Sequence, residues 1–330
     1  MRSPAFADPS PSNASQPDYR DTGWDALQPG DIRGAVQYLL GHSVTGMTRA
    51  PGGVVNQVWH VQFATHRGVT IKVAPCWFAG SLQREARCLQ LLRQRGVPVP
   101  DVVDVIPAHV EPLPGHDLLL MTTVDGRSLR RTDLVPARLP HLLRPYRTLH
   151  DTALDGYGWF TPDFTGRHLS WRSYLLDLEE VPELTAVPAW RPRREALVSL
   201  LAAVPEVVPA RLLYGDYNRD NFLVTTDGTL VALDFQGCFA GDPLYDWATI
   251  LLKEPDHVPL FTHVLEPTDG HWRRITAYQA RVLWNMAVYY SSRDPRRSEI
   301  LTYQLDTLLD AALRRDDAQP LAPGLSPRRA

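Results

Sequence analysis

Asp216, Asn221 and Asp234 stand out in this chain of 330 residues because their types and spacing could support chemistry. Asp216 and Asn221 precede an apolar run at residues 222–225. Asp234 ends a second apolar run at residues 229–234. The short turn between the two runs predicts a β-hairpin, and a hairpin brings its outer ends together. We therefore expect the three side chains to converge.

Oxygen-bearing side chains of this kind suit phosphoryl transfer. Asn221 and Asp234 could bind a hard divalent cation such as Mg²⁺, which clamps the triphosphate of a nucleotide. Asp216 could orient an acceptor hydroxyl and take its proton, and its spacing from Asn221 equals that of the kinase catalytic loop. The alternative is ordinary turn chemistry, because Asp and Asn are common turn residues. Asp234 fits that alternative poorly, since an uncompensated carboxylate at the end of an apolar run is costly.

A second pair of charged residues lies in the first third of the chain. Lys72 interrupts an apolar run at residues 69–73, in a chain with only two lysines among 34 basic residues. A compact ammonium serves a phosphate in a way that Arg does not copy. Glu85 lies on the apolar face of a helix predicted over residues 81–95, where a carboxylate needs a cation. We expect Glu85 to pair with Lys72 over nucleotide phosphates. The alternatives are a strand-edge lysine and a helix-edge glutamate, both in water.

The elements that must position these residues fall into two parts. Residues 23–124 are rich in strand-like runs, whereas residues 125–315 show mostly helical spacing with the hairpin embedded among helices. Residues 1–22 and 316–330 are polar and rich in Pro, without periodicity, and we expect them to be flexible tails. The sequence therefore predicts an α+β, bilobal fold with a small β-rich N-terminal lobe and a larger helical C-terminal lobe.

The expected elements can be given with approximate bounds. In the first lobe we expect helices at residues 31–40, capped by Asp31, and 81–95, and strands at residues 54–63, 69–73, 102–106 and 117–123. In the second lobe we expect helices near residues 138–151, 169–181, 193–204, 244–253 and 270–315.

Composition excludes several classes of protein. Hydrophobic residues make up 44% and charged residues 22% of the chain, which is typical of a globular protein. A net charge of −3 argues against a nucleic-acid partner, and the apolar runs are far shorter than the ~18 residues of a membrane span. Three cysteines without a CxxC pair, and no signal peptide at the N-terminus, favour a cytoplasmic protein without disulfides.

Taken together, these residues resemble the aminoglycoside phosphotransferase and choline kinase group, small-molecule relatives of the protein kinases. The resemblance runs from about Gly52 to Ala248. It is strongest at residues 214–221 and 233–246, which are similar to the family patterns H-G-D-x4-N and I-D-x(6,7)-G-D-P-x2-D. It implies a protein-kinase-like fold and assigns roles as follows: Asp216 as catalytic base, Asn221 and Asp234 as Mg²⁺ ligands, and Lys72 with Glu85 as the nucleotide ion pair.

Other residues complete the expected nucleotide site. Gly53 and Asn56 could form a turn that covers the nucleotide, although this signal is weak alone. The resemblance implies that Met121 lies beside the adenine pocket. It also implies that the backbone of Thr123 and Val124 offers hydrogen bonds to the nucleotide.

The chain departs from the family pattern at one important position. The family histidine before Gly-Asp is Tyr214 here, and we expect it to brace the loop in the same way. Asp242 is expected to cap the helix that follows, and Asp246 to bond back to the catalytic loop. The Leu149-His150 pair resembles one common in the family. No segment resembles the protein-kinase A-P-E motif, so a protein substrate is not expected.

The resemblance implies an O-phosphotransferase that uses Mg²⁺ and ATP, or alternatively GTP, to phosphorylate a hydroxyl of a small molecule. An aminoglycoside-type or other antibiotic is the first expectation for the acceptor. Acidic residues at 177–183, or Glu254 with Asp256, could attract a polycationic sugar or could be solvated helix faces. The alternatives are a metabolic kinase of an amino alcohol or sugar, and a silent kinase-fold binding protein. We expect a monomer or homodimer.

Overall fold

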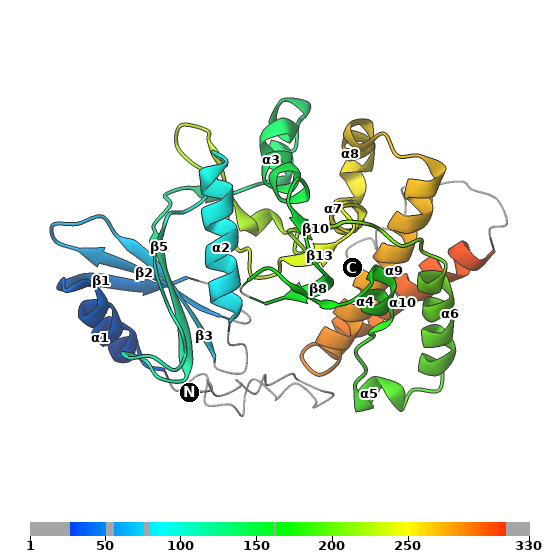
Figure 1. Cartoon of the computed structure of the whole chain (residues 1–330), viewed down its shortest axis with the longest axis horizontal. Coiled ribbons are helices and arrows are strands. Elements are labelled where there is room, and N and C mark those ends of the chain that lie inside the picture. Colours follow the sequence, from blue (N-terminus) through cyan, green and yellow to red (C-terminus); the bar gives the residue numbers. More distant parts are fainter. Residues whose placement is uncertain (1–26, 51–55, 76–79, 162, 315–330) are drawn as a thin grey trace, which may run out of the picture.

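The alternation of apolar residues along the first strands produces a sheet with a helix on each face. The computed structural model describes residues 27–50, 56–75, 80–161 and 163–314, so both expected tails lie outside it. Figure 1 shows the sheet on one side of the molecule and most helices on the other. The sheet is antiparallel and has the order β1-β2-β3-β5-β4. Its strands are β1 (Val44–Arg49), β2 (Gln57–Phe63), β3 (Val69–Pro75), β4 (Val102–Ile106) and β5 (His116–Thr122).

Successive residues of β3 face opposite sides of this sheet. Ile71 and Val73 are fully buried and pack in the cluster that includes α1 (Pro29–Leu40). Lys72 pairs in register with Leu119, which belongs to the other cluster, below α2 (Ser81–Gln94). The period of two thus turns Lys72 toward α2, on which Glu85 lies.

The C-terminal lobe combines two small sheets with a set of helices. One sheet has the order β7-β10-β13-β8-β9, and the other has the order β12-β11-β6. The strands are β6 (Arg127–Ser128), β7 (Ala153–Leu154), β8 (Tyr157–Phe160), β9 (Gly166–His168), β10 (Ala210–Leu213), β11 (Phe222–Val224), β12 (Leu230–Ala232) and β13 (Phe239–Gly241). The helices are α3 (Leu139–His150), α4 (Trp171–Leu176), α5 (Pro182–Thr185), α6 (Trp190–Ala202), α7 (Leu244–Lys253), α8 (Val258–Leu265), α9 (Asp269–Ser291) and α10 (Pro295–Leu313).

The predicted hairpin is present as β11 and β12, with Phe222 opposite Ala232 and Val224 opposite Leu230. The described part of this lobe also has short helical turns: η3 (Arg131–Asp133), η4 (Pro136–Arg138), η5 (Arg219–Asn221) and η6 (Pro255–His257). Turn η5 leads directly into β11, so the polar segment before the hairpin is held by the strand that follows.

Several expectations for the elements were wrong. Strand β1 was not predicted, because its mostly half-exposed residues do not alternate between apolar and polar. The single helix expected over residues 270–315 is two helices, since the chain turns at residues 292–294 before Pro295. Asp31 does not cap α1; Gln28 is the N-cap, and Asp31 accepts a bond from its backbone N–H at 2.8 Å.

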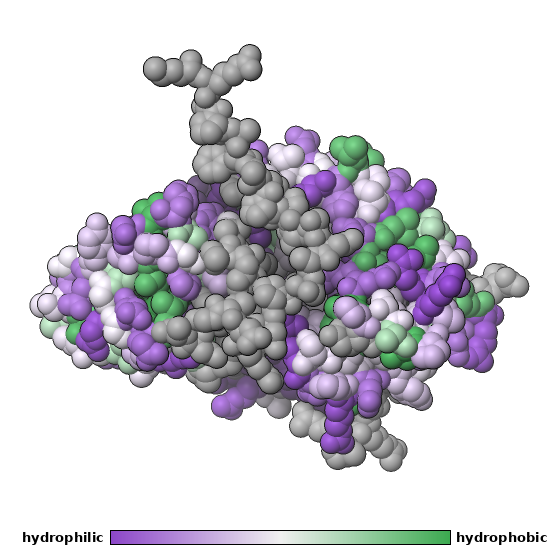
Figure 2. Space-filling view, turned by 90° about the horizontal axis from the view of Figure 1, so that it is seen from below, coloured by the Kyte–Doolittle hydropathy of each residue, from purple (hydrophilic) through white to green (hydrophobic). Residues whose placement is uncertain are grey.

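The molecular surface mixes hydrophilic and hydrophobic residues (Figure 2). No helix in the described part of the chain combines the length and the apolar character needed to cross a membrane. On the face shown in Figure 2, hydrophilic residues surround smaller groups of hydrophobic ones. Cys88 and Cys238 are buried free thiols, and Cys76 lies outside the described residues.

Candidate active site

A buried lysine joins two carboxylates from opposite lobes. Lys72 Nζ lies 2.8 Å from Glu85 Oε1 and 2.9 Å from Asp234 Oδ1. Glu85 is fully buried, and its Oε1 also accepts the backbone N–H of Phe235 at 3.3 Å. The predicted pair is therefore present, and Asp234 completes it from the C-terminal lobe.

The ammonium of Lys72 carries its charge in this setting. Burial lowers the pKa of Lys72, but the carboxylates of Asp234 and Glu85 raise it, and the balance lies above the usual value. The side chain of Asp234 is 41% exposed, so its carboxylate opens away from the buried pair. A fixed cation beside an open carboxylate is the arrangement that phosphate and metal binding require.

The hairpin brings Asn221 and the Asp234 segment together, as the sequence predicts. Asn221 precedes β11, and its carbonyl accepts the N–H of Leu233 at 2.8 Å. The next residue, Asp234, has a φ of 57°, a left-handed conformation that Asp tolerates better than most residues. The chain therefore turns away from the strand at Asp234, and the carboxylate of Asp234 contacts Lys72 there.

Asn221 also fixes the loop that contains Asp216. Its Nδ2 donates to the carbonyl of Asp216 at 3.1 Å, which leaves the amide oxygen directed elsewhere. Asn221 is 9% exposed, whereas the side chain of Asp216 is 52% exposed. Asp216 thus presents its carboxylate to solvent from a loop that is held from behind.

The donor set fits a hard divalent cation. Asn221 supplies an amide oxygen, and Asp234 supplies a partly exposed carboxylate, both of which Mg²⁺ accepts as ligands. Among the residues that the structure describes, no three His, Cys, Asp or Glu side chains gather as a metal site. Any cation here would therefore take further ligands from a bound molecule or water.

Sequence reasoning missed Lys253, which lies against Asp216. Lys253 Nζ is 3.0 Å from Asp216 Oδ1, at the C-terminal end of α7. A cation is favoured there by the partial negative charge of the helix end. The signal that could have found it is composition, because both lysines of the chain contact carboxylates of this site.

Residues at both ends of helix α7 contact the loop that contains Asp216, at residues 214–219. In its first turn, Asp246 accepts the backbone N–H groups of Tyr214 (2.9 Å) and Gly215 (2.8 Å) and contacts His150 Nε2 (2.8 Å). The expected bond from Asp246 to the loop is confirmed. After its last turn, Glu254 Oε1 lies 3.0 Å from Tyr217 Oη and 3.0 Å from Arg219 Nε. The loop is therefore shaped by one helix.

Asp242 was expected to cap α7, but it is not the N-cap residue. The N-cap of α7 is Pro243, and Asp242 lies one residue earlier. Its carboxylate accepts the N–H of Leu244 at 3.1 Å and also contacts Arg274 and Tyr278 on α9, each at 2.7 Å. It therefore joins α7 to α9.

We predict that Asp246→Ala destabilises the protein by about 3 kcal/mol, because two buried backbone N–H groups lose their acceptor. Urea unfolding followed by circular dichroism measures this loss. Asp310→Ala removes an exposed pair with Arg314 and serves as the control, with a change under about 0.5 kcal/mol. Equal stability of the two variants would contradict the role given to Asp246.

Tyr214 braces the loop where the family has histidine. Its ring is fully buried, and its hydroxyl donates to the carbonyl of Leu233, next to Asp234. Burial raises the pKa of Tyr214 well above its usual value, so the phenol keeps its proton and donates. Tyrosine therefore connects the Asp216 loop with the Asp234 segment.

Asn56 lies between the lobes. Asn56 Nδ2 donates to Gln236 Oε1 at 2.6 Å, and Gln236 Nε2 donates to Ser81 Oγ at 2.7 Å. The side chain of Asn56 is thus engaged within the protein, and Gly53 lies outside the described residues. A contact of either residue with nucleotide stays a prediction.

The segment that connects the lobes contains the expected hinge residues. Met121 is 6% exposed in β5 and packs in the larger core cluster. The N–H of Thr123 lies 3.4 Å from the carbonyl of Gly68, so a ligand would use the carbonyl of Thr123 rather than this N–H. Val124 follows without regular structure.

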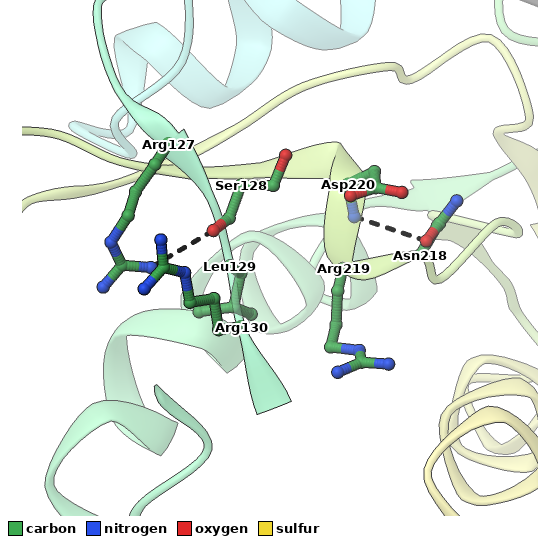
Figure 3. A pocket seen from close by; sticks show the side chains of 7 residues that line it. All are labelled: Arg127, Ser128, Leu129, Arg130, Asn218, Arg219 and Asp220. Carbon is green, nitrogen blue, oxygen red and sulfur yellow. Dashed lines mark hydrogen bonds between the residues drawn. The ribbon is translucent and has the colours of Figure 1, made fainter. Parts of the chain in front are cut away.

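A pocket of about 420 Å³ lies beside the catalytic loop, lined by residues 127–130 and 218–220. In Figure 3, Arg127 and Arg130 extend on one side of it and Arg219 on the other. Residues 218–220 lie between Asp216 and Asn221 in the sequence, so the loop that contains Asp216 forms part of the pocket wall.

Solved structures share this architecture. Aminoglycoside phosphotransferase APH(4)-Ia in a ternary complex with ADP and hygromycin B is 17% identical, with a TM-score of 0.67 over 85% of this chain and 98% of that chain. A putative fructosamine-3-kinase from Thermobifida fusca is 20% identical, with a TM-score of 0.60 over 86% of this chain and 99% of that one. Amicoumacin kinase hAmiN, in complex with AMP-PNP, Ca²⁺ and Ami, is 17% identical, with a TM-score of 0.61 over 80% and 88%. The expected bilobal, protein-kinase-like fold is confirmed.

Sequence comparison identifies the family. No curated protein matches the chain. The sequence profile of the phosphotransferase enzyme family, however, matches residues 46–278, which include every candidate residue described above. This match covers more than half of the chain and confirms the resemblance found in its motifs. The chain belongs to the phosphotransferase enzyme family and is a kinase of small molecules.

Proposed function

We propose that the protein transfers the γ-phosphate of ATP, with Mg²⁺, to a hydroxyl of a small molecule. One observation carries this proposal: Lys72 Nζ contacts both Glu85 and Asp234, while Asn221, next to the Asp234 segment, holds the Asp216 loop. A candidate base and two oxygen ligands thus flank one hairpin, and a cation from the other lobe contacts one of these ligands. Nucleotides bound to neighbours of the same fold support ATP as the donor, and GTP remains an alternative.

Each side chain would have a distinct part in the reaction. Lys72, held by Glu85, binds the phosphates of the nucleotide, and the backbone near Thr123 and Val124 binds its base. Asn221 and Asp234 hold Mg²⁺, which when bound neutralises charge on the phosphates. Asp216 accepts the proton of the acceptor hydroxyl as its oxygen attacks the γ-phosphorus and the bond to the leaving ADP oxygen breaks.

The acceptor is proposed to be an antibiotic or a comparable hydroxylated molecule. The support is that APH(4)-Ia and hAmiN, which share this fold, are solved with hygromycin B and Ami respectively. Two of the acidic residues that could attract a polycation are already paired: Glu254 with Arg219 and Asp256 with Arg131. A neutral or acidic hydroxylated molecule therefore fits this part of the site better than a polycationic one.

The direct test is to incubate the protein with Mg²⁺, ATP or GTP, and a panel of hydroxylated antibiotics, amino alcohols and sugars. Mass spectrometry should find one acceptor whose mass increases by one phosphate, with release of nucleoside diphosphate. Asp216→Asn is the control and should give no product. Absence of nucleotide binding by the wild type, measured by calorimetry, would contradict the proposal and favour a silent member of the fold.

We predict that Lys253→Met lowers kcat about 10- to 100-fold, because Asp216 loses the contact that orients its carboxylate and a positioned general base contributes roughly 10²–10⁴-fold to rate. Steady-state release of ADP, with acceptor or with water as acceptor, measures the effect. Folding stability should change by less than about 0.5 kcal/mol, since the pair with Asp216 is partly exposed. Lys253→Arg keeps the charge and should retain more activity. Equal rates in the wild type and Lys253→Met would show that Lys253 has no part in the reaction.

A further inference from the structure

The pocket beside the catalytic loop has an unusual set of charges. Three of its side chains are arginines, Arg127, Arg130 and Arg219, and its one acid is Asp220. In Figure 3 the carboxylate of Asp220 points away from the three guanidinium groups. Positive charge therefore dominates this pocket, whose wall is partly formed by the loop that contains Asp216.

Two of these arginines already have partners outside the pocket. Arg127 makes a two-pronged pair with Asp133, one contact being 2.9 Å from Nη2 to Oδ1, and this pair lowers the pKa of Asp133 well below its usual value. Arg219 uses Nε for Glu254 at 3.0 Å, which leaves its terminal nitrogens for a ligand. Glu254 is only 5% exposed, so it stays behind Arg219.

Arg130 has no such compensation. Across the described ranges of the chain, no carboxylate lies within 4.0 Å of its guanidinium, although Arg130 lines the pocket beside Arg127. A guanidinium next to another cation, with five donors in a planar fork, is suited to a planar or tetrahedral anion. The pocket thus contains one cation that lacks an anion.

Apart from Asp220, whose carboxylate points away from the guanidinium groups (Figure 3), the carboxylates named around the loop are in the opposite situation. Asp216 pairs with Lys253, and Glu254, Asp133 and Asp256 each pair with an arginine. An ammonium group of a ligand would have to displace one of these internal cations, and it would meet Arg130 and Lys253 as like charges. The surroundings of the loop therefore disfavour a polycationic acceptor.

We infer that the acceptor has an acidic group, a carboxylate or a phosphate, which binds Arg130 and the terminal nitrogens of Arg219 while its hydroxyl reaches Asp216. The inference rests on the proposed function and adds the charge class of the acceptor. The two cations that carry the inference are Lys253 at the base and Arg130 in the pocket.

The test uses three sugars that share one ring: glucuronate, neutral glucose and cationic glucosamine. Calorimetric titration of the full chain with Mg²⁺ and ADP should show that glucuronate binds at least tenfold more tightly than glucosamine, with glucose between them. Arg130→Gln should remove this preference. The matched control is Arg131→Gln, which removes a neighbouring arginine that does not line the pocket and should keep the preference.

Clear outcomes would overturn the inference. These are failure of glucuronate to bind, glucosamine binding as tightly as glucuronate, or an unchanged preference in Arg130→Gln. Hydrolysis of ATP by the wild type and by Arg130→Gln is measured in parallel. Normal hydrolysis without a preference for the acid contradicts only the charge class of the acceptor. Loss of nucleotide binding in the wild type would contradict the proposed phosphotransfer itself.

Discussion

Asp216→Asn should abolish phosphoryl transfer while the protein still binds nucleotide. The amide keeps the size of the carboxylate and one acceptor oxygen, but it cannot accept the proton of the acceptor hydroxyl. General base catalysis contributes roughly 10²–10⁴-fold to rate, so we expect kcat to fall by about this factor. ADP release, with an acceptor identified in the panel, gives kcat and KM separately.

The geometry of Asp216 explains why binding should survive this change. The side chain is 52% exposed and, among the described residues, makes its one polar contact with Lys253, whereas the loop is held through its backbone by Asn221 and Asp246. The dissociation constant for ADP and the unfolding midpoint should therefore stay near the wild-type values. Asp227→Asn, an isosteric change at the exposed turn of the hairpin, is the control and should retain activity. Wild-type turnover in Asp216→Asn would exclude Asp216 as the base.

Asp234→Ala should remove both transfer and the dependence of nucleotide binding on Mg²⁺. The substitution deletes a proposed metal ligand and also leaves the buried Lys72 with only Glu85 as partner. In calorimetric titrations, the wild type should bind ATP much more tightly with Mg²⁺ than with a chelator. The variant should bind ATP with the same affinity in both conditions.

Two further variants separate the roles of Asp234. Asp234→Asn keeps an oxygen ligand but removes the charge beside Lys72, so we expect partial dependence on Mg²⁺. Glu85→Gln disturbs the same lysine without touching a metal ligand, and the dependence on Mg²⁺ should remain. An Asp234→Ala variant that still responds to Mg²⁺ as the wild type does would place the metal elsewhere.

The parts of the site that local spacing controls were predictable from sequence. Asn221 and Asp234 lie at the two ends of a hairpin, and the register of β11 with β12 brings them together whatever the rest of the chain does. Lys72 was predictable for a similar reason, because strand alternation gives it one face and helical spacing gives Glu85 the opposing one. Such contacts depend on only two elements at a time.

Contacts that depend on packing between distant elements were not predictable. Lys253 is 37 residues from Asp216, and it reaches that carboxylate only because Asp246, two turns earlier on α7, is anchored to the loop. Glu254 pairs with Arg219 through the same packing. From sequence, Glu254 could attract a polycationic sugar, but in the structure its charge is already paired. No periodicity in the sequence reports where the end of a helix lies relative to a loop.

Contacts of residues 234–236 with the N-terminal lobe restrict how the two lobes can move. Lys72 contacts Asp234, Glu85 accepts the N–H of Phe235, and Asn56 contacts Gln236, so three consecutive residues of one lobe are tied to the other. Wide separation of the lobes would break all three ties at once. A rotation of the two lobes about residues 234–236 would keep these contacts. We expect the enzyme to admit nucleotide and release product by such a rotation.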